Sequence, residues 1–144
     1  MTTKKSRLSI LCTVAVGILA ACQTLNATAP AAGLPEPDAQ CVVTEARFQQ
    51  LYDRHCTATA GGNQLLPKYC TNAAAAQNFC RMVQNAPHKI RVVQPDGRVS
   101  YEASLGLVAG TAGETCGRLV IESPTDGTVV NGFPQSSGAL GACK

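Results

Sequence analysis

The chain is poor in large apolar side chains. It has 144 residues, no tryptophan, and only three phenylalanines and three tyrosines. A core made of Ala, Val and Leu buries less apolar area per residue, and a domain of about 100 residues is small. We therefore expect a fold of this composition to depend on covalent cross-links as well as on packing.

The usual sequence signatures of enzymes are also missing. There is no Gly-x-Ser-x-Gly elbow and no Cys-x-x-Cys pair, and the glycine-rich stretch 106–117 lacks the Lys-Ser/Thr ending of a phosphate loop. His55 and His88 are the only histidines, and their spacing matches no zinc motif. A metal site built from both and a thiol is the alternative to two partly exposed surface side chains. Three acidic residues could form a carboxylate pair, although charged strand residues are usually solvated: Glu102, Glu114 and Glu122. We expect no catalytic residue, metal or cofactor.

The first 22 residues have the three zones of an export signal. Lys4, Lys5 and Arg7 make the start basic, Leu8–Ile18 is apolar and uncharged, and small residues follow. This order is typical of a secretory signal. The apolar run is shorter than the roughly 20 residues that a membrane-spanning helix needs.

The segment Leu19-Ala20-Ala21-Cys22 resembles the lipobox of bacterial lipoproteins. The resemblance implies diacylglyceryl transfer to the Cys22 thiol, cleavage before Cys22 and acylation of the new amino terminus. Stable anchoring needs more than one acyl chain. Gln23 follows the cysteine, which in Gram-negative lipoproteins implies the outer membrane, on its periplasmic face or at the cell surface. The alternative is an ordinary secretory signal that leaves Cys22 free.

Removing the signal changes the charge balance. Cleavage takes away Lys4, Lys5 and Arg7 but no acidic residue, so Lys and Arg fall from 12 to nine, equal to the nine acidic residues. The mature chain is neutral, and nothing in its composition indicates nucleic-acid binding.

Six cysteines remain after Cys12 and Cys22 are set aside, and an even set in a small exported domain is typical of three disulfides. Fifteen pairings are possible. Two antiparallel helices joined by a short loop favour Cys56–Cys70 and then Cys41–Cys80, which leaves Cys116–Cys143 to tie down the tail.

The chain divides into three regions. Residues 1–21 are the lipoprotein signal, residues 22–39 carry the lipidated cysteine and a flexible Ala/Pro-rich tether, and residues 40–144 form a small disulfide-rich domain. The tail from Phe133 onward is rich in Gly and Ser, and we expect it to be held only by Cys143.

Two helices are predicted at the start of the domain. Thr44 is the predicted N-cap of the first helix, and Phe48, Leu51, Tyr52 and Cys56 follow at helical spacing. A second helix begins after Thr71 or Asn72, either of which can cap it, and ends at Pro87. Its apolar stripe is Ala73, Ala76, Phe79, Cys80 and Val83.

After Pro87 the pattern changes from helix to strand. Residues 89–93 and 98–105 flank the turn at Asp96-Gly97, and residues 117–123 and 128–132 flank the turn at Asp126-Gly127. Each glycine accepts the positive φ that a tight hairpin needs. We therefore expect an α+β fold, in which a disulfide-stapled antiparallel helix pair is followed by two β-hairpins forming a small antiparallel sheet. A weak internal repeat of the hairpins is a less favoured interpretation.

The expected function is binding, because loops on a rigid scaffold are common recognition sites. The candidate loops are residues 61–69, with Leu65, Leu66, Lys68 and Tyr69 as contacts, and the connector at residues 106–115. The two leucines either fill the space between the helices or form an exposed patch. The sequence thus predicts a non-enzymatic outer-membrane lipoprotein that binds a protein or envelope component. The alternatives are an inhibitor, immunity or exclusion lipoprotein and, less favoured, a small envelope hydrolase.

Overall fold

The computed structural model describes residues 36–58 and 63–143, which belong to a compact unit spanning Pro35–Lys144. The signal, Cys22 and residues 23–35 lie outside the described residues. The folded unit begins earlier than the sequence predicts, because residues assigned to the tether are held by it. Asp38 pairs with Arg91, and the Ala39 N–H donates to the Pro124 carbonyl at 2.7 Å.

The helices form where the apolar stripes predict them. Helix α1 (Glu45–His55) is capped by the Thr44 side chain, and α2 (Ala73–Gln84) is capped by Asn72, which accepts from the Ala75 N–H at 2.8 Å. Between them the structure adds a short 3-10 helix, η1 (Pro67–Tyr69), that the sequence does not predict. No helix of the described residues is long and apolar enough to cross a bilayer.

Four antiparallel strands follow in the order in which they occur along the chain. They are β1 (Ile90–Val93), β2 (Val99–Ser104), β3 (Cys116–Ile121) and β4 (Val129–Gln135). Both predicted hairpins are present, and the pairing of β2 with β3 joins them into one sheet. Residues 133–135, predicted as part of the tail, belong to β4.

The two turn glycines have different roles. Gly97 has the expected positive φ of 87°. Gly127 does not, so that expectation is wrong. A Cβ at Gly127 would lie 1.9 Å from the carbonyl oxygen of Gln40, which shows that close passage of another backbone segment requires glycine there.

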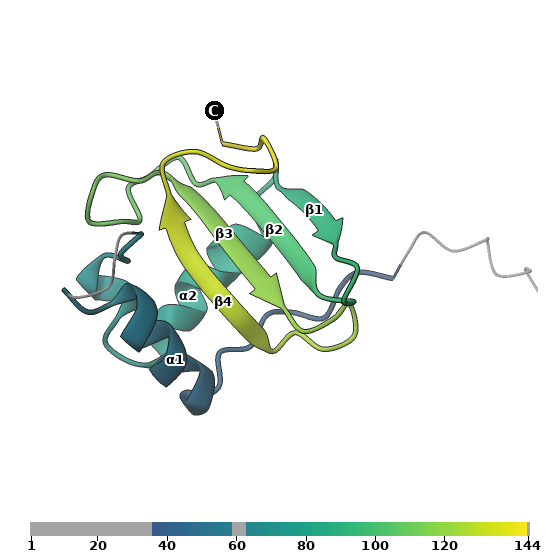
Figure 1. Cartoon of the computed structure of the whole chain (residues 1–144), viewed down its shortest axis with the longest axis horizontal. Helices are drawn as coiled ribbons and strands as arrows, with labels where there is room; N and C mark the ends of the chain where they lie inside the picture. Colours follow the sequence, from purple (N-terminus) through teal and green to yellow (C-terminus); the bar gives the residue numbers. More distant parts are fainter. Residues whose placement is uncertain (1–35, 59–62, 144) are drawn as a thin grey trace, which may run out of the picture. The chain divides into compact units, whose positions relative to one another are not determined.

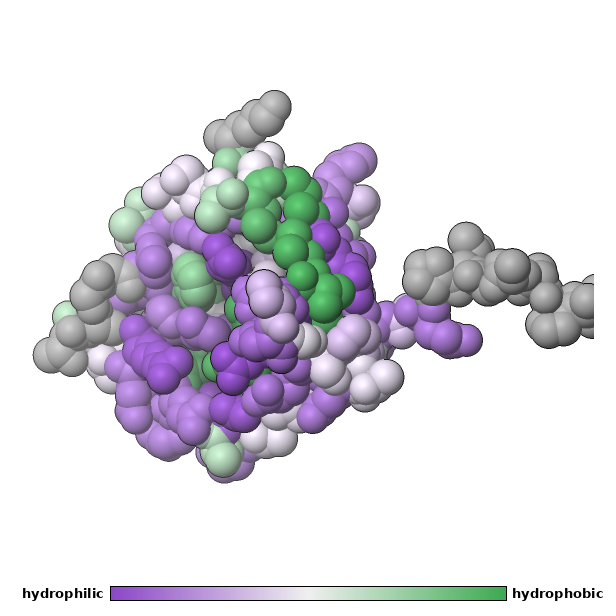
Figure 2. All heavy atoms as spheres, turned by 45° about the vertical axis from the view of Figure 1, so that its right-hand side comes forward, coloured by the Kyte–Doolittle hydropathy of each residue, from purple (hydrophilic) through white to green (hydrophobic). Residues whose placement is uncertain are grey.

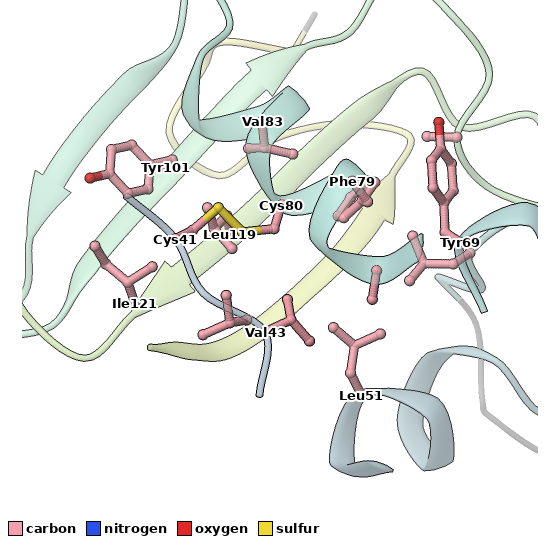
Figure 3. Packing of buried hydrophobic residues seen from close by; sticks show 14 of the residues in the cluster. Cys41, Val43, Leu51, Tyr69, Phe79, Cys80, Val83, Tyr101, Leu119 and Ile121 are labelled. Atoms are coloured by element: carbon pink, nitrogen blue, oxygen red, sulfur yellow. A yellow bond between two sulfur atoms is a disulfide. The ribbon is translucent and has the colours of Figure 1, made fainter. Parts of the chain in front are cut away.

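The helices cover one face of the sheet. Helix α2 packs against β2, β3 and β4, while α1 packs against β4 and α2; Figure 1 shows α2 behind the strands. The core between these layers includes Phe79 and Val83 from α2 and Tyr101 and Leu119 from the sheet (Figure 3). The predicted helix pair is therefore confirmed in part: the helices touch, but the sheet is also a packing surface for both.

All three predicted disulfides are confirmed. Cys41–Cys80 ties the segment before α1 to α2 and lies in the core (Figure 3), and Cys56–Cys70 joins the ends of α1 and η1. Cys116–Cys143 fastens the chain end to β3. Their Cα–Cα distances are 6.3, 5.7 and 5.8 Å.

Candidate binding site at the edge of the sheet

The candidate loop at residues 61–69 is largely packed against the fold; its residues 61 and 62 lie outside the described ranges. Leu65 is only 2 % exposed, and its N–H donates to the His55 carbonyl at 2.8 Å. Leu66 is half-buried against the core, and buried Tyr69 lies 5.6 Å from Phe79 between ring centroids. Lys68 alone of the four is exposed, with its Nζ 4.9 Å from the Tyr69 ring. The leucines therefore fill space beside the helices, and Leu65 and Tyr69 are not accessible to a partner.

The two histidines are placed differently from each other. His55 is half-buried, with Nδ1 3.1 Å from the Asn63 carbonyl oxygen and Nε2 3.0 Å from Asn131 Oδ1, and its ring stacks on Phe133. Burial lowers the pKa of His55, although its two hydrogen-bond partners act in the opposite direction. His88 is exposed before β1. Within residues 36–58 and 63–143, no group of three or more His, Cys, Asp or Glu side chains is arranged to hold a metal ion.

The three carboxylates singled out above are not simply solvated, so that expectation is wrong. Glu102 is 0 % exposed and accepts the backbone N–H groups of Leu140 at 2.9 Å and Ala142 at 3.0 Å. Glu114 is buried and accepts from the Ala112 N–H at 2.9 Å, and Glu122 forms an ion pair with Arg47 at 2.6 Å. These carboxylates are occupied in holding loops and helices in place.

A cleft of about 390 Å³ lies on the helix side of β1. Its walls come from three places: the segment of residues 36–43, which we call the N-terminal strap, the end of α2, and β1 with its neighbour β2. The side chains that determine its chemistry are Glu36, Asp38, Gln84, Lys89, Arg91 and Tyr101. A second hollow, of about 370 Å³, lies beside Cys56–Cys70.

The strongest charges of the cleft are paired with each other. Arg91 Nη2 donates to Asp38 Oδ1 at 2.6 Å, Arg91 Nε donates to Asp38 Oδ2, and the Tyr101 hydroxyl also donates to Asp38. The hydrogen bond from Arg91 lowers the pKa of Asp38, whereas burial and the bond to Asp38 raise the pKa of Tyr101 to about 12. At neutral pH the tyrosine is protonated and the aspartate ionised. Both groups are therefore committed to holding the N-terminal strap on the sheet.

The two edges of the sheet differ in what lies against them. At the β4 edge, the Val129 N–H donates to the Val42 carbonyl of the strap at 2.9 Å, and His55 contacts Asn131 further along. No strand among the described residues pairs with the outer edge of β1. We call this outer side of β1 the open edge.

The open edge also carries exposed apolar side chains. Val92 is 38 % exposed and Val93 is 49 % exposed, and their side chains point to opposite faces of the sheet. Figure 2 brings the β1 side of Figure 1 forward and shows a stripe of apolar side chains there. An unpaired strand with exposed valines on both faces can accept a further strand by backbone hydrogen bonding.

The sequence predicts β1 as a strand but indicates neither its position at the edge of the sheet nor the cleft. The cleft depends on Asp38, which the Ala/Pro-rich composition assigns to the tether. The predicted Cys41–Cys80 bond is the signal that could have placed residues 38–40 beside the second helix.

No family model, curated protein or solved structure matches this chain.

Proposed function

We propose that this chain is a non-enzymatic lipoprotein of the bacterial outer membrane, anchored through Cys22, whose domain binds a protein through the open edge of β1. The observation that carries the binding role is the pair of exposed valines on an unpaired strand. The lipobox-like segment at residues 19–22 supports the anchor, and three disulfides suit an oxidising compartment outside the cytoplasm.

The engagement of the reactive side chains supports a non-enzymatic role. Glu102 and Glu114 hold backbone segments, His55 lies between Asn63 and Asn131, and Asp38 is bound by Arg91 and Tyr101. Each of these groups would have to break a structural contact before acting as a base or nucleophile. An inhibitor, immunity or exclusion role would need the projecting loop at residues 61–69, and Leu65 and Tyr69 of that loop are buried.

The anchor is tested by comparing the wild-type chain with Cys22→Ser in the bacterial host. We expect wild-type protein in the outer-membrane fraction, with an intact mass that begins at Cys22 and includes the lipid. The variant should lose the lipid and leave the membrane fraction. Wild-type protein with an unmodified Cys22 would overturn the anchor.

The binding role is tested by placing a photo-crosslinking amino acid at Val92 of the full chain in living cells. A matched variant carries it at Arg81, which is exposed on α2. We expect an adduct of defined mass from position 92 that Arg81 does not give. Equal yields at the two positions would contradict binding at the open edge.

A further inference from the structure

We propose that the protein bound at the open edge is a second copy of this chain, paired antiparallel about a two-fold axis at Val92. This inference depends on the proposed function and names its partner. The pairing would join two four-stranded sheets into one continuous sheet across the interface.

The backbone of β1 is suited to such pairing. The Gln94 N–H donates to the Arg98 carbonyl at 2.8 Å, so the backbone N–H of Gln94 points toward β2. Hydrogen-bonded pairs alternate along an antiparallel ladder, so the backbone groups of Val92 point toward β2 and those of Arg91 and Val93 point outward. The open edge therefore offers the N–H and C=O groups of Arg91 and Val93 to a partner.

Proline and charge select one register for self-pairing. Pairing Arg91 with Arg91 of the second copy places like charges directly opposite each other, which is destabilising. Pairing Val93 with Val93 places Pro95, which has no N–H, at an outward position that should donate a hydrogen bond. The register that pairs Arg91 with Val93 of the second copy avoids both problems and gives about four backbone hydrogen bonds.

This register also covers the exposed valines. Val92 lies opposite Val92 of the second copy on the face away from the helices. On the helix face, each Val93 lies beside the aliphatic stem of the opposing Arg91. Because the Arg91 guanidinium stays paired with Asp38, the interface buries apolar surface without leaving that charge unpaired.

The arrangement is compatible with two lipid anchors in one membrane. Directly opposed residues of paired strands point to the same face, so the helix faces of the two copies lie on one side of the joined sheet. The N-terminal strap is bound to Arg91 and Tyr101 on that helix face. Both chains therefore enter their folded units on the same side.

The balanced charge of the cleft beside the open edge favours a second copy of the chain over an unrelated charged peptide as the partner. Glu36 and Asp38 balance Lys89 and Arg91, so the cleft presents no excess charge to a ligand. Recognition is left to backbone hydrogen bonds and β-branched side chains, which β1 itself supplies.

The interface is small, because a four-residue strand is only about 13 Å long. Contact of this size falls below the area of typical stable complexes. Pairing should therefore depend on confinement of the anchored chains to one membrane, and it should weaken on dilution in detergent.

The register is tested by disulfide cross-linking of single-cysteine substitutions in the full chain in native membranes. Residues in a non-hydrogen-bonded pair have Cα atoms about 4.5 Å apart, within disulfide range, so Val92→Cys should give a covalent homodimer on mild oxidation. Val93→Cys is the matched control. In the proposed register residue 93 lies opposite residue 91 of the second copy, so the two cysteine side chains introduced at position 93 are offset by two residues and out of disulfide range. Peptide mapping should show the three native disulfides intact in both variants.

A second variant tests whether the contact is strand pairing. Val93→Pro removes an outward N–H but leaves the ladder with β2 in place, and proline is tolerated at such edge positions. Combined with Val92→Cys, it should reduce the dimer yield at least tenfold while circular dichroism stays unchanged. Undiminished dimer formation would overturn edge pairing.

The outcomes separate this inference from the proposed function. A homodimer from position 92 but not 93 supports both. A photo-adduct at position 92 with another protein, and no homodimer, overturns self-pairing and leaves the binding function standing. If neither the homodimer nor the photo-adduct formed, both self-pairing and the proposed binding function would be overturned. A higher yield of homodimer from position 93 than from position 92 would overturn the register.

Discussion

Glu102 is a buried carboxylate that organises the end of the chain. It lies in β2 and accepts backbone N–H groups from the C-terminal tail, which we define as residues 136–143. Burial raises the pKa of Glu102, but the hydrogen bonds from Leu140, Ala142, Gln135 and Cys143 together outweigh it, so the net pKa is lowered. Cys143 is therefore not alone in holding the tail, contrary to the sequence-based expectation.

We expect Glu102→Gln to lower the free energy of unfolding by about 2 kcal/mol, since an amide replaces a charged acceptor that two N–H groups share. The amides of Leu140 and Ala142 should also exchange hydrogen faster. Urea denaturation and hydrogen exchange measure these effects. Glu122→Gln is the control, since its half-exposed ion pair should contribute less than about 1 kcal/mol. Unchanged exchange at both amides would contradict the role of Glu102.

His55 should make stability depend on pH below neutrality. Its folded pKa lies below the unfolded value of about 6.5, chiefly because of burial, so the unfolded chain binds more protons between the two values. The free energy of unfolding should therefore decrease as pH falls below about 6.5 and through the folded pKa. His55→Gln should flatten this decrease between pH 7.5 and 5.5, whereas replacement of exposed His88 should not. A parallel decrease in the His55 variant would show that other groups are responsible.

At the scale of elements, local sequence patterns predict the helices and strands well. They do not predict the contacts between those elements. The Thr44 cap and the stripe through Phe79 and Val83 predict the helices, and β-branched residues around Asp96-Gly97 predict the first hairpin. Which strand forms the open edge depends on the sheet order, and the cleft depends on Asp38 meeting Arg91 across 53 residues. No local periodicity encodes either fact, so local patterns alone do not predict the candidate site, and only the Cys41–Cys80 bond indicates that residues 38–40 lie near the second helix.

The close packing of α2 on β3 depends on Gly117. A Cβ at this position would lie 2.5 Å from Val83 Cγ2, so we expect Gly117→Ala to cost about 1–3 kcal/mol. Gly132 on β4 faces the same helix layer, but a Cβ there would meet Leu51 and Phe79 at an ordinary 3.7 Å. Gly132→Ala should therefore be neutral or stabilising by up to about 1 kcal/mol. Denaturation curves of the two variants would contradict this view if they shifted equally.

At the scale of the whole molecule, the disulfide framework is predictable because it follows from few assumptions. Once Cys12 and Cys22 are set aside, a short connection between two helices leaves one favoured pairing of the remaining cysteines. The structure has that pairing, although the first cysteine lies before α1 and the helices also pack on the sheet. The pairing is insensitive to those differences because it requires only the helix ends to be adjacent.

The three disulfides should differ in how much they stabilise the fold. They separate their cysteines by 39, 27 and 14 residues, for Cys41–Cys80, Cys116–Cys143 and Cys56–Cys70. In the chain-entropy model, these loops correspond to about 4, 3.5 and 3 kcal/mol. Cys41 and Cys80 are also buried in the core, so replacing them by alanine removes packing as well. We expect the free energy of unfolding to fall most for the Cys41/Cys80 double alanine variant and least for Cys56/Cys70, as measured by guanidinium denaturation without reductant. If the Cys56/Cys70 variant were the least stable, the short link between α1 and η1, rather than the attachment of the strap to α2, would be the main constraint on the fold.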